Sequence, residues 1–219
     1  MIWDWRFAAD VLPDLLRGLR VTLQAVAGGM SLALVLGLVW ALCRRARRPW
    51  VSWPVAGLVE AVRSTPLLIQ LFFVYYVLPA AGVVVDPWVA GLAALGLHYS
   101  AYTSEVYRAG LDGVPRGQWL AARALNLTRF ETYRHVVLPQ ALPPVVPALG
   151  NYLIAMFKDA PLLSAITVQE VLSTARNLGN EHFRYLEPLT LVGVFFLVLS
   201  LLAGSLVRWL ERRLKVVSA

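Results

Sequence analysis

The sequence predicts an all-α integral membrane protein with about five transmembrane helices, and three observations lead to this prediction. Hydrophobic residues make up 58% of the 219 residues and charged residues only 15%, whereas soluble domains carry about 25% charged residues. The mean hydropathy is +0.63. Several uncharged stretches are long enough to cross a hydrocarbon core of about 30 Å, which takes about 20 apolar helical residues. We therefore treat residues 1–219 as a single transmembrane domain.

Five apolar segments are the predicted spans, at approximately residues 19–43, 50–78, 88–108, 142–166 and 188–209. The second is interrupted by Arg63-Ser64-Thr65-Pro66, and the fourth carries Lys158 and Asp159. The fifth contains no charge from Leu189 to Val207. Before the first span, residues 7–18 have one apolar and one charged side, so we expect a separate short amphipathic helix on the outer face of the membrane.

The distribution of basic residues predicts the orientation. Three segments, residues 44–48, 108–134 and 208–215, hold 4, 5 and 4 of the 20 Lys and Arg residues. Basic residues concentrate in cytoplasmic segments. The N-terminus is therefore expected outside and the C-terminus in the cytoplasm, in a multi-pass protein.

Composition also excludes several kinds of site. The net charge of +7 does not indicate nucleic acid, because no basic face is interleaved with exposed aromatic residues. Cys43 is the only cysteine, so no internal disulfide can form. His98, His135 and His182 lie in different segments without metal-ligand spacing, and we expect no metal site.

The connection between the third and fourth predicted spans, residues 112–140, is the most informative segment. Pro115 can begin a helix, residues 118–127 have the small and apolar residues of a helix that docks, and a second helix is expected at about residues 130–137. Two short helices in one cytoplasmic loop would form a projection that fits a groove in a partner.

At this point the chain resembles a known family. Residues 117–126, Gly-Gln-Trp-Leu-Ala-Ala-Arg-Ala-Leu-Asn, ending ten residues before Val136-Val137-Leu138-Pro139, resemble the EAA loop of type I ABC-importer permeases. The polar amino acid uptake subfamily is the most similar. Four further runs carry the resemblance, which covers roughly residues 15–213: residues 19–23, 63–72, 101–105 and 158–164.

The resemblance implies a permease subunit of an ATP-binding cassette importer in the bacterial plasma (inner) membrane. It would form half of the pathway for polar amino acids or similar zwitterionic solutes, a set that includes compatible solutes such as ectoine. The implied partners are a second permease, identical or paralogous, two ATPase subunits and an extracytoplasmic solute-binding protein. The chain would bind no cofactor and would be no enzyme, with ATP and Mg²⁺ held by the ATPase subunits.

The resemblance also assigns the residues that couple to the ATPase. Leu120 stands where the family has Glu, and Asn126 where it has Gly, although Asn tolerates the left-handed conformation. In the fourth span, Ala160-Pro161 replaces a hydroxyl pair, and Pro161 is expected to break the helix. The expected coupling residues are Gly117, Gln118, Leu120, Ala121, Ala122, Asn126, Leu138 and Pro139.

Polar residues within the spans are the candidates for the translocation pathway, because charges in hydrocarbon normally face a cavity or one another. Arg63 would line the pathway, pair structurally with Asp159, or reach the membrane interface. Lys158 adjoins Asp159 on the helix and points elsewhere. The candidates are Arg63, Thr65, Gln70, Tyr75, Asn151, Lys158, Asp159 and Ser164.

Two further polar residues lie in the third span. Glu105 is expected to pair with Arg108 one turn later, with a gating or packing role as the alternative. His98 is expected to be a hydrogen-bonded interior histidine.

Two other functional classes compete with the importer. A self-contained channel or ion-driven secondary transporter commonly shows internal repeats, and we find none. A membrane-embedded enzyme would need a catalytic motif such as His-Glu-x-x-His or Gly-x-Ser-x-Gly, and the sequence contains neither. It also lacks Gly-x-x-x-x-Gly-Lys-Ser/Thr, so ATP hydrolysis is expected from a separate subunit.

Overall fold

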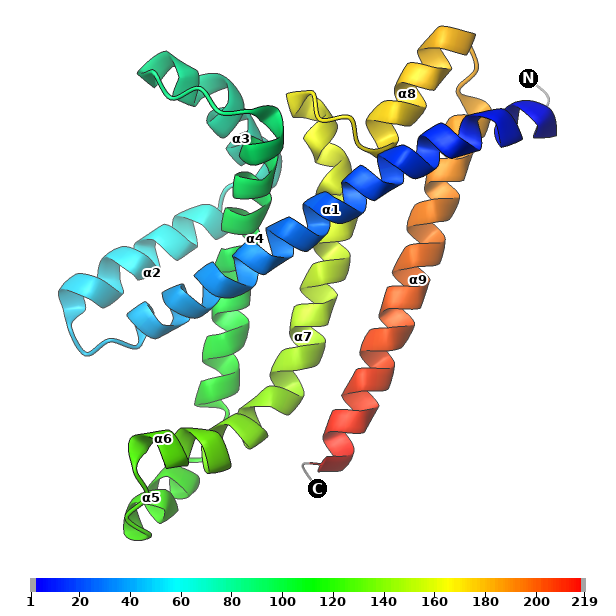
Figure 1. The fold of residues 1–219 in the computed structure, drawn as a ribbon. Coiled ribbons are helices and arrows are strands. Elements are labelled where there is room, and N and C mark those ends of the chain that lie inside the picture. Colours follow the sequence, from blue (N-terminus) through cyan, green and yellow to red (C-terminus); the bar gives the residue numbers. More distant parts are fainter. Residues whose placement is uncertain (1–2, 218–219) are drawn as a thin grey trace.

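The computed structural model describes residues 3–217, which are entirely helical apart from short connections (Figure 1). In chain order the helices are α1 (Trp5–Arg44), α2 (Pro49–Arg63), α3 (Leu67–Phe72), η1 (Phe73–Val77), η2 (Leu78–Ala81), α4 (Pro87–Asp112), α5 (Arg116–Ala124), α6 (Arg129–Glu131), η3 (Thr132–Val137), α7 (Leu138–Asp159), η4 (Ala160–Ile166), α8 (Val171–His182) and α9 (Leu186–Val217). The prediction of an all-α protein is confirmed.

The helices pack as a bundle crossed obliquely by α1 (Figure 1). Small residues let α1 and α4 approach closely, since a Cβ atom at Gly37 would lie 2.0 Å from the Thr103 hydroxyl. That hydroxyl is buried and donates a hydrogen bond to the Ala33 carbonyl at 2.8 Å. The main core continues from this contact into α3, α7 and η4 through buried residues such as Leu71, Met156 and Leu163.

The prediction of a separate amphipathic helix at residues 7–18 is wrong, because these residues are the first turns of the continuous α1. Their apolar side packs on α8 and α9, where Val11 and Leu15 are buried with Val171 and Val192. The helix continues without a break into the first predicted span, even though Pro13 lies within it.

Length and hydropathy identify two of the described helices, α1 and α9, as long and apolar enough to cross a membrane. The predicted second span bends by 104° between α2 and residues 67–81, and would be a third crossing if the pair counts as one. The predicted third and fourth spans coincide with α4 and with α7 plus η4. The five boundaries and the orientation stay predictions.

Different helices form the two ends of the bundle (Figure 1). Helices α5 and α6 lie at the same end as the C-terminus, while α8 lies at the end where α1 begins. The α1 helix starts with Asp4 as its N-cap, whose side chain accepts from the Arg6 backbone at 2.9 Å. These positions agree with a coupling segment and an outer face at opposite ends.

Glu170 starts α8 and is fully buried. Its carboxylate accepts hydrogen bonds from the backbone N–H groups of Leu172 at 2.9 Å and Ser173 at 2.7 Å. Burial raises the pKa of Glu170 to about 7, while these two hydrogen bonds lower it. The α8 N-terminus is held against α1, because the Val171 N–H donates to the Thr22 hydroxyl at 3.2 Å.

The close contact between α1 and α4 predicts a specific sensitivity. Gly37→Ala should destabilise the protein by about 1–3 kcal/mol, because the new methyl group overlaps Thr103. Gly57→Ala is the matched control, since nothing lies within 4 Å of its added Cβ. This variant should be stabilised by about 0.5–1 kcal/mol, because alanine favours the helix more than glycine does. Unfolding temperatures in detergent measure both, and equal shifts in the two variants would contradict this packing.

The buried Glu170 predicts a pH dependence of stability. Glu170 binds its proton more tightly in the folded chain than in the unfolded chain. Its contribution to the free energy of unfolding is therefore complete below the ordinary pKa of 4.5 and is lost as the pH rises through about 7. The free energy of unfolding falls by about 3 kcal/mol at most from this cause. The unfolding temperature should therefore fall between pH 5 and pH 8, and fall less in Glu170→Gln. Identical pH profiles for both proteins would rule out this source.

Candidate functional site

The segment between α4 and η3 folds into a compact projection, here called the coupling knob and defined as residues 113–131. Helix α5 ends with Asn126 in the left-handed conformation at φ 52°. The Leu127 N–H donates to the Ala122 carbonyl at 3.0 Å, and the Asn126 N–H donates to the Arg123 carbonyl at 2.9 Å. This pair of bonds is a Schellman motif. The left-handed conformation expected of Asn126 is therefore confirmed.

A capping box begins the second helix of the knob. The Thr128 N–H donates to the Glu131 carboxylate at 2.8 Å, and the Glu131 N–H donates to the Thr128 hydroxyl at 3.2 Å. Hydrogen bonds from the Thr128 hydroxyl and backbone hold the pKa of Glu131 below its ordinary value. Both ends of the turn are thus fixed by local hydrogen bonds, and the knob has a defined shape.

Three large apolar side chains, here called the apolar tip of the knob, are exposed together with the basic side chains of Arg116, Arg123 and Arg129. Leu120, Leu125 and Phe130 are 63%, 73% and 70% exposed. Among the predicted coupling residues, Ala121 is also exposed, whereas Ala122 is buried within its own chain at 2% exposure. Leu125 and Phe130 were not among the coupling residues predicted from the sequence, although two large apolar residues in a basic loop could have indicated a docking surface.

The remaining predicted coupling residues fall into two places. Gly117 and Gln118 are exposed on the first turns of α5. Leu138 and Pro139 are exposed in the first turn of α7, which follows α6 and η3 without a break. The expected second short helix is therefore the beginning of a longer one that joins the knob directly to α7.

The break between α2 and α3 is closed by Gln70. Its side-chain amide donates to the carbonyls of Val62 at 2.7 Å and Thr65 at 3.0 Å, so it caps the end of α2. Its oxygen lies 3.3 Å from Nδ1 of His98. His98 is 9% exposed, which confirms the expected interior, hydrogen-bonded histidine.

Aromatic rings gather beside this break, on α4 and α7. The rings of His98 and Tyr102 lie 5.2 Å apart, and those of Tyr102 and Tyr152 lie 5.5 Å apart. The Tyr99 hydroxyl donates to the Asp159 carboxylate at 2.7 Å. These contacts form a half-buried cluster of hydroxyl, imidazole and carboxylate groups. Three of its members, Tyr99, Tyr102 and Tyr152, were not among the sequence candidates.

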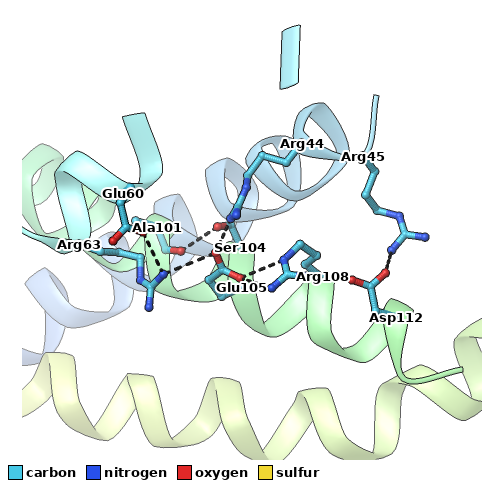
Figure 2. A network of polar contacts seen from close by, with 9 residues as sticks. All are labelled: Arg44, Arg45, Glu60, Arg63, Ala101, Ser104, Glu105, Arg108 and Asp112. Carbon is cyan, nitrogen blue, oxygen red and sulfur yellow. Dashed lines mark hydrogen bonds and ion pairs between the residues drawn. The ribbon is translucent and has the colours of Figure 1, made fainter. Parts of the chain in front are cut away.

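An ion-pair network centred on Glu105 connects α1, α2 and α4 (Figure 2). Its carboxylate pairs with Arg108 at 2.8 Å, with Arg63 at 3.6 Å, and with Arg44. The predicted pair with Arg108 is confirmed, and the other two arginines come from distant segments. Arg108 also forms an ion pair with Asp112 at 3.0 Å, and Asp112 pairs in turn with Arg45.

Of the three alternatives for Arg63, the structural pair with Asp159 is wrong. Arg63 lies near Glu105 and Glu60, at 3.6 and 3.5 Å, and its guanidinium is over the Tyr102 ring at 5.6 Å. Asp159 accepts from Tyr99 instead. Arg63 ends α2 within reach of Glu105 on α4, which also pairs with Arg44 at the end of α1, whereas Asp159 ends α7.

The other pathway candidates divide by how their polar groups are bonded. Two hydroxyls donate hydrogen bonds to backbone carbonyls. The Thr65 hydroxyl donates to the Ala61 carbonyl at 2.7 Å, and the Ser164 hydroxyl donates to the Pro161 carbonyl at 2.8 Å. The Tyr75 hydroxyl lies 3.4 Å from that of Thr167.

Two candidates on α7, Asn151 and Lys158, are exposed, and no described residue forms an ion pair with Lys158. Three candidates, Arg63, Gln70 and Asp159, each contact a residue of α4, namely Glu105, His98 and Tyr99 respectively.

Pro161 ends α7 as expected, because the helix changes to the 3₁₀ segment η4 at Ala160. Among residues 3–217, no three His, Cys, Asp or Glu side chains are placed to hold a metal ion.

Known proteins resemble the whole chain. The family model described as "binding-protein-dependent transport system inner membrane component" matches residues 33–216. A probable amino-acid ABC transporter permease of Sinorhizobium fredii is 50% identical over 92% of this chain and 87% of its own length. The glutamine transport system permease of Escherichia coli is 34% identical over 99% of this chain and 100% of its own.

A solved structure shows the same arrangement of helices. A crystal structure of an amino acid ABC transporter with histidines superposes with a TM-score of 0.91 at 31% identity, over 97% of this chain and all of that chain. The chain belongs to the inner membrane component family of binding-protein-dependent transport systems, as an amino-acid ABC importer permease.

Proposed function

We propose that this chain forms half of the translocation pathway of an importer for polar amino acids or similar zwitterionic solutes. The coupling knob carries the proposal, because it is locally rigid, exposed and apolar at its tip. A surface of that kind suits rigid-body movement of a docked partner. The other half would be a second permease, identical or paralogous, with one ATPase subunit on each knob and a binding protein on the outer face.

The ATPase subunits would hold ATP and Mg²⁺, while this chain would bind no cofactor. Leu120 stands where the family has Glu. Its side chain would be buried against the ATPase, and this apolar contact would take the place of an ion pair. The exposed Ala121, Leu125 and Phe130 would extend that contact. Gly117 and Gln118 begin α5 beside it, and Leu138 and Pro139 begin α7.

The solute pathway would follow the polar side of α3, α4 and α7. Asp159 would supply an anionic contact for the ammonium group of a zwitterion, whereas Lys158 points elsewhere on α7 and would line another part of the pathway. Gln70, Tyr75 and Asn151 would add neutral hydrogen-bonding groups, and Arg63 would close the cytoplasmic side. Thr65 and Ser164 would line the backbone at the two breaks.

The class of solute follows from chemistry shared with the relatives, which are named for amino acids and for glutamine. Compatible solutes such as ectoine are zwitterions too and fit the same groups. Thermal-shift screening of the binding protein against amino acids and osmolytes would identify the solute.

Reconstitution distinguishes the importer from a self-contained channel or an ion-driven transporter. In proteoliposomes, uptake should require the ATPase subunits, the binding protein and ATP, and should be unaffected by ion gradients. Uptake by this chain alone, driven by an ion gradient, would instead establish the alternative function.

The exposed tip of the knob predicts the effect of one substitution. Ala121→Arg should lower solute-stimulated ATPase activity at least tenfold, because a bulky charge would be buried against the ATPase. The protein should still insert and keep its unfolding temperature. Ala9→Arg is the matched control, an exposed alanine on the first turns of α1, and should leave coupling unchanged. Full coupling in Ala121→Arg would show that the knob is not the docking surface.

The ion-pair network predicts a graded loss of stability. Glu105→Gln should lower the free energy of unfolding by about 1–3 kcal/mol, because three arginines lose their shared carboxylate. Asp112→Asn should cost less than about 1 kcal/mol, because its side chain is 48% exposed against 22% for Glu105. Thermal unfolding in detergent compares the two variants, and an equal or larger loss in Asp112→Asn would contradict the central position of Glu105.

A further inference from the structure

An apolar groove of about 290 Å³ lies between α1, α7 and α9, apart from the polar pathway candidates. Its floor includes Val26 of α1 and Phe157 of α7, which are 5% and 7% exposed. Its rim includes Leu23 and Leu153, at 44% and 39% exposure, so the groove opens to the surface. No charged residue lines it.

A second, shallower hollow of about 370 Å³ extends the groove along α1 and shares Leu23 and Ala27 with it. Arg20 and Gln24 line this hollow, one helical turn apart and both exposed. Arg20 has no acidic partner among the described residues, whereas Arg17, one turn earlier, pairs with Asp14 at 3.1 Å. The apolar groove therefore continues into a hollow lined by the exposed guanidinium of Arg20.

We propose that this groove binds one phospholipid of the outer leaflet, with an acyl chain between α1, α7 and α9 and the phosphate on Arg20. Arg20 lies at the outer end of the first predicted span, where a lipid phosphate is found. The distance from Arg20 to Ala27 is about 10 Å along the helix axis. This length fits within one leaflet, which is half of a hydrocarbon core of about 30 Å.

The charge and the lining of the groove favour a lipid as the occupant. An anionic headgroup complements the exposed Arg20 of the adjoining hollow, and an acyl chain matches a lining that holds no charged residue. The apolar lining excludes a polar solute, because burying an unbonded polar group costs about 1–3 kcal/mol on the protein scale. The phosphate is the anion that pairs with Arg20, and the Gln24 amide can donate a further hydrogen bond to it.

Native mass spectrometry of the full chain, purified from membranes in a mild detergent, tests the lipid. One phospholipid per chain should remain after detergent washing. Arg20→Ala and the groove-filling Ala27→Phe should each lower this occupancy at least fivefold. The matched controls are Arg17→Ala, the paired arginine, and Val35→Phe, a 63% exposed site on α1 outside the groove. Both should retain the lipid. Equal occupancy in all variants, or no retained lipid in the parent protein, would overturn the proposal.

Photo-crosslinking identifies the occupant independently, so that a misfolded Ala27→Phe variant does not decide the outcome. With p-benzoylphenylalanine in place of Leu23 on the rim, irradiation in membranes should add the mass of a phospholipid to the chain. An adduct with a polypeptide, whether a second copy or another permease, would show that the groove is a protein interface and would refute lipid binding.

Discussion

Backbone groups at membrane depth have to be bonded within the protein, and the broken second span depends on this constraint. The chain turns by 104° between α2 and α3, which frees carbonyl groups at the end of α2. The Gln70 amide bonds two of them, and its oxygen faces His98 on α4. One side chain therefore satisfies the break and connects it to the neighbouring helix.

Charged residues from three helices meet at one carboxylate. Arg63 pairs with the same Glu105 that holds Arg44 and Arg108, so one partly buried carboxylate compensates cations from α1, α2 and α4. Removing one partner of such a group leaves uncompensated charge. The network thereby joins the ends of α1 and α2 to the part of α4 that leads into the coupling knob.

The knob itself is shaped by local rules. A Schellman motif ends α5, and a capping box starts α6, so the turn between them needs no partner to fold. Its apolar tip, in contrast, has no cover within the described chain. Stable shape combined with uncovered apolar surface is the arrangement expected of a docking element. The lipid groove is a separate surface on α1, α7 and α9 and does not involve this tip.

The sequence alone determined the properties that depend on composition and on neighbouring residues. Charge-free runs predicted the helices, Asn126 was expected to tolerate the left-handed conformation it adopts, Pro161 ended α7, and Glu105 paired with Arg108 one turn away. Only the tertiary structure decided the remaining contacts. Arg44 is 61 residues from Glu105, Arg63 of α2 pairs with Glu105 of α4, and Ala122 proved buried where Ala121 is exposed. Helix periodicity relates residues within a few turns, whereas these contacts depend on how separate helices cross, which no local pattern contains.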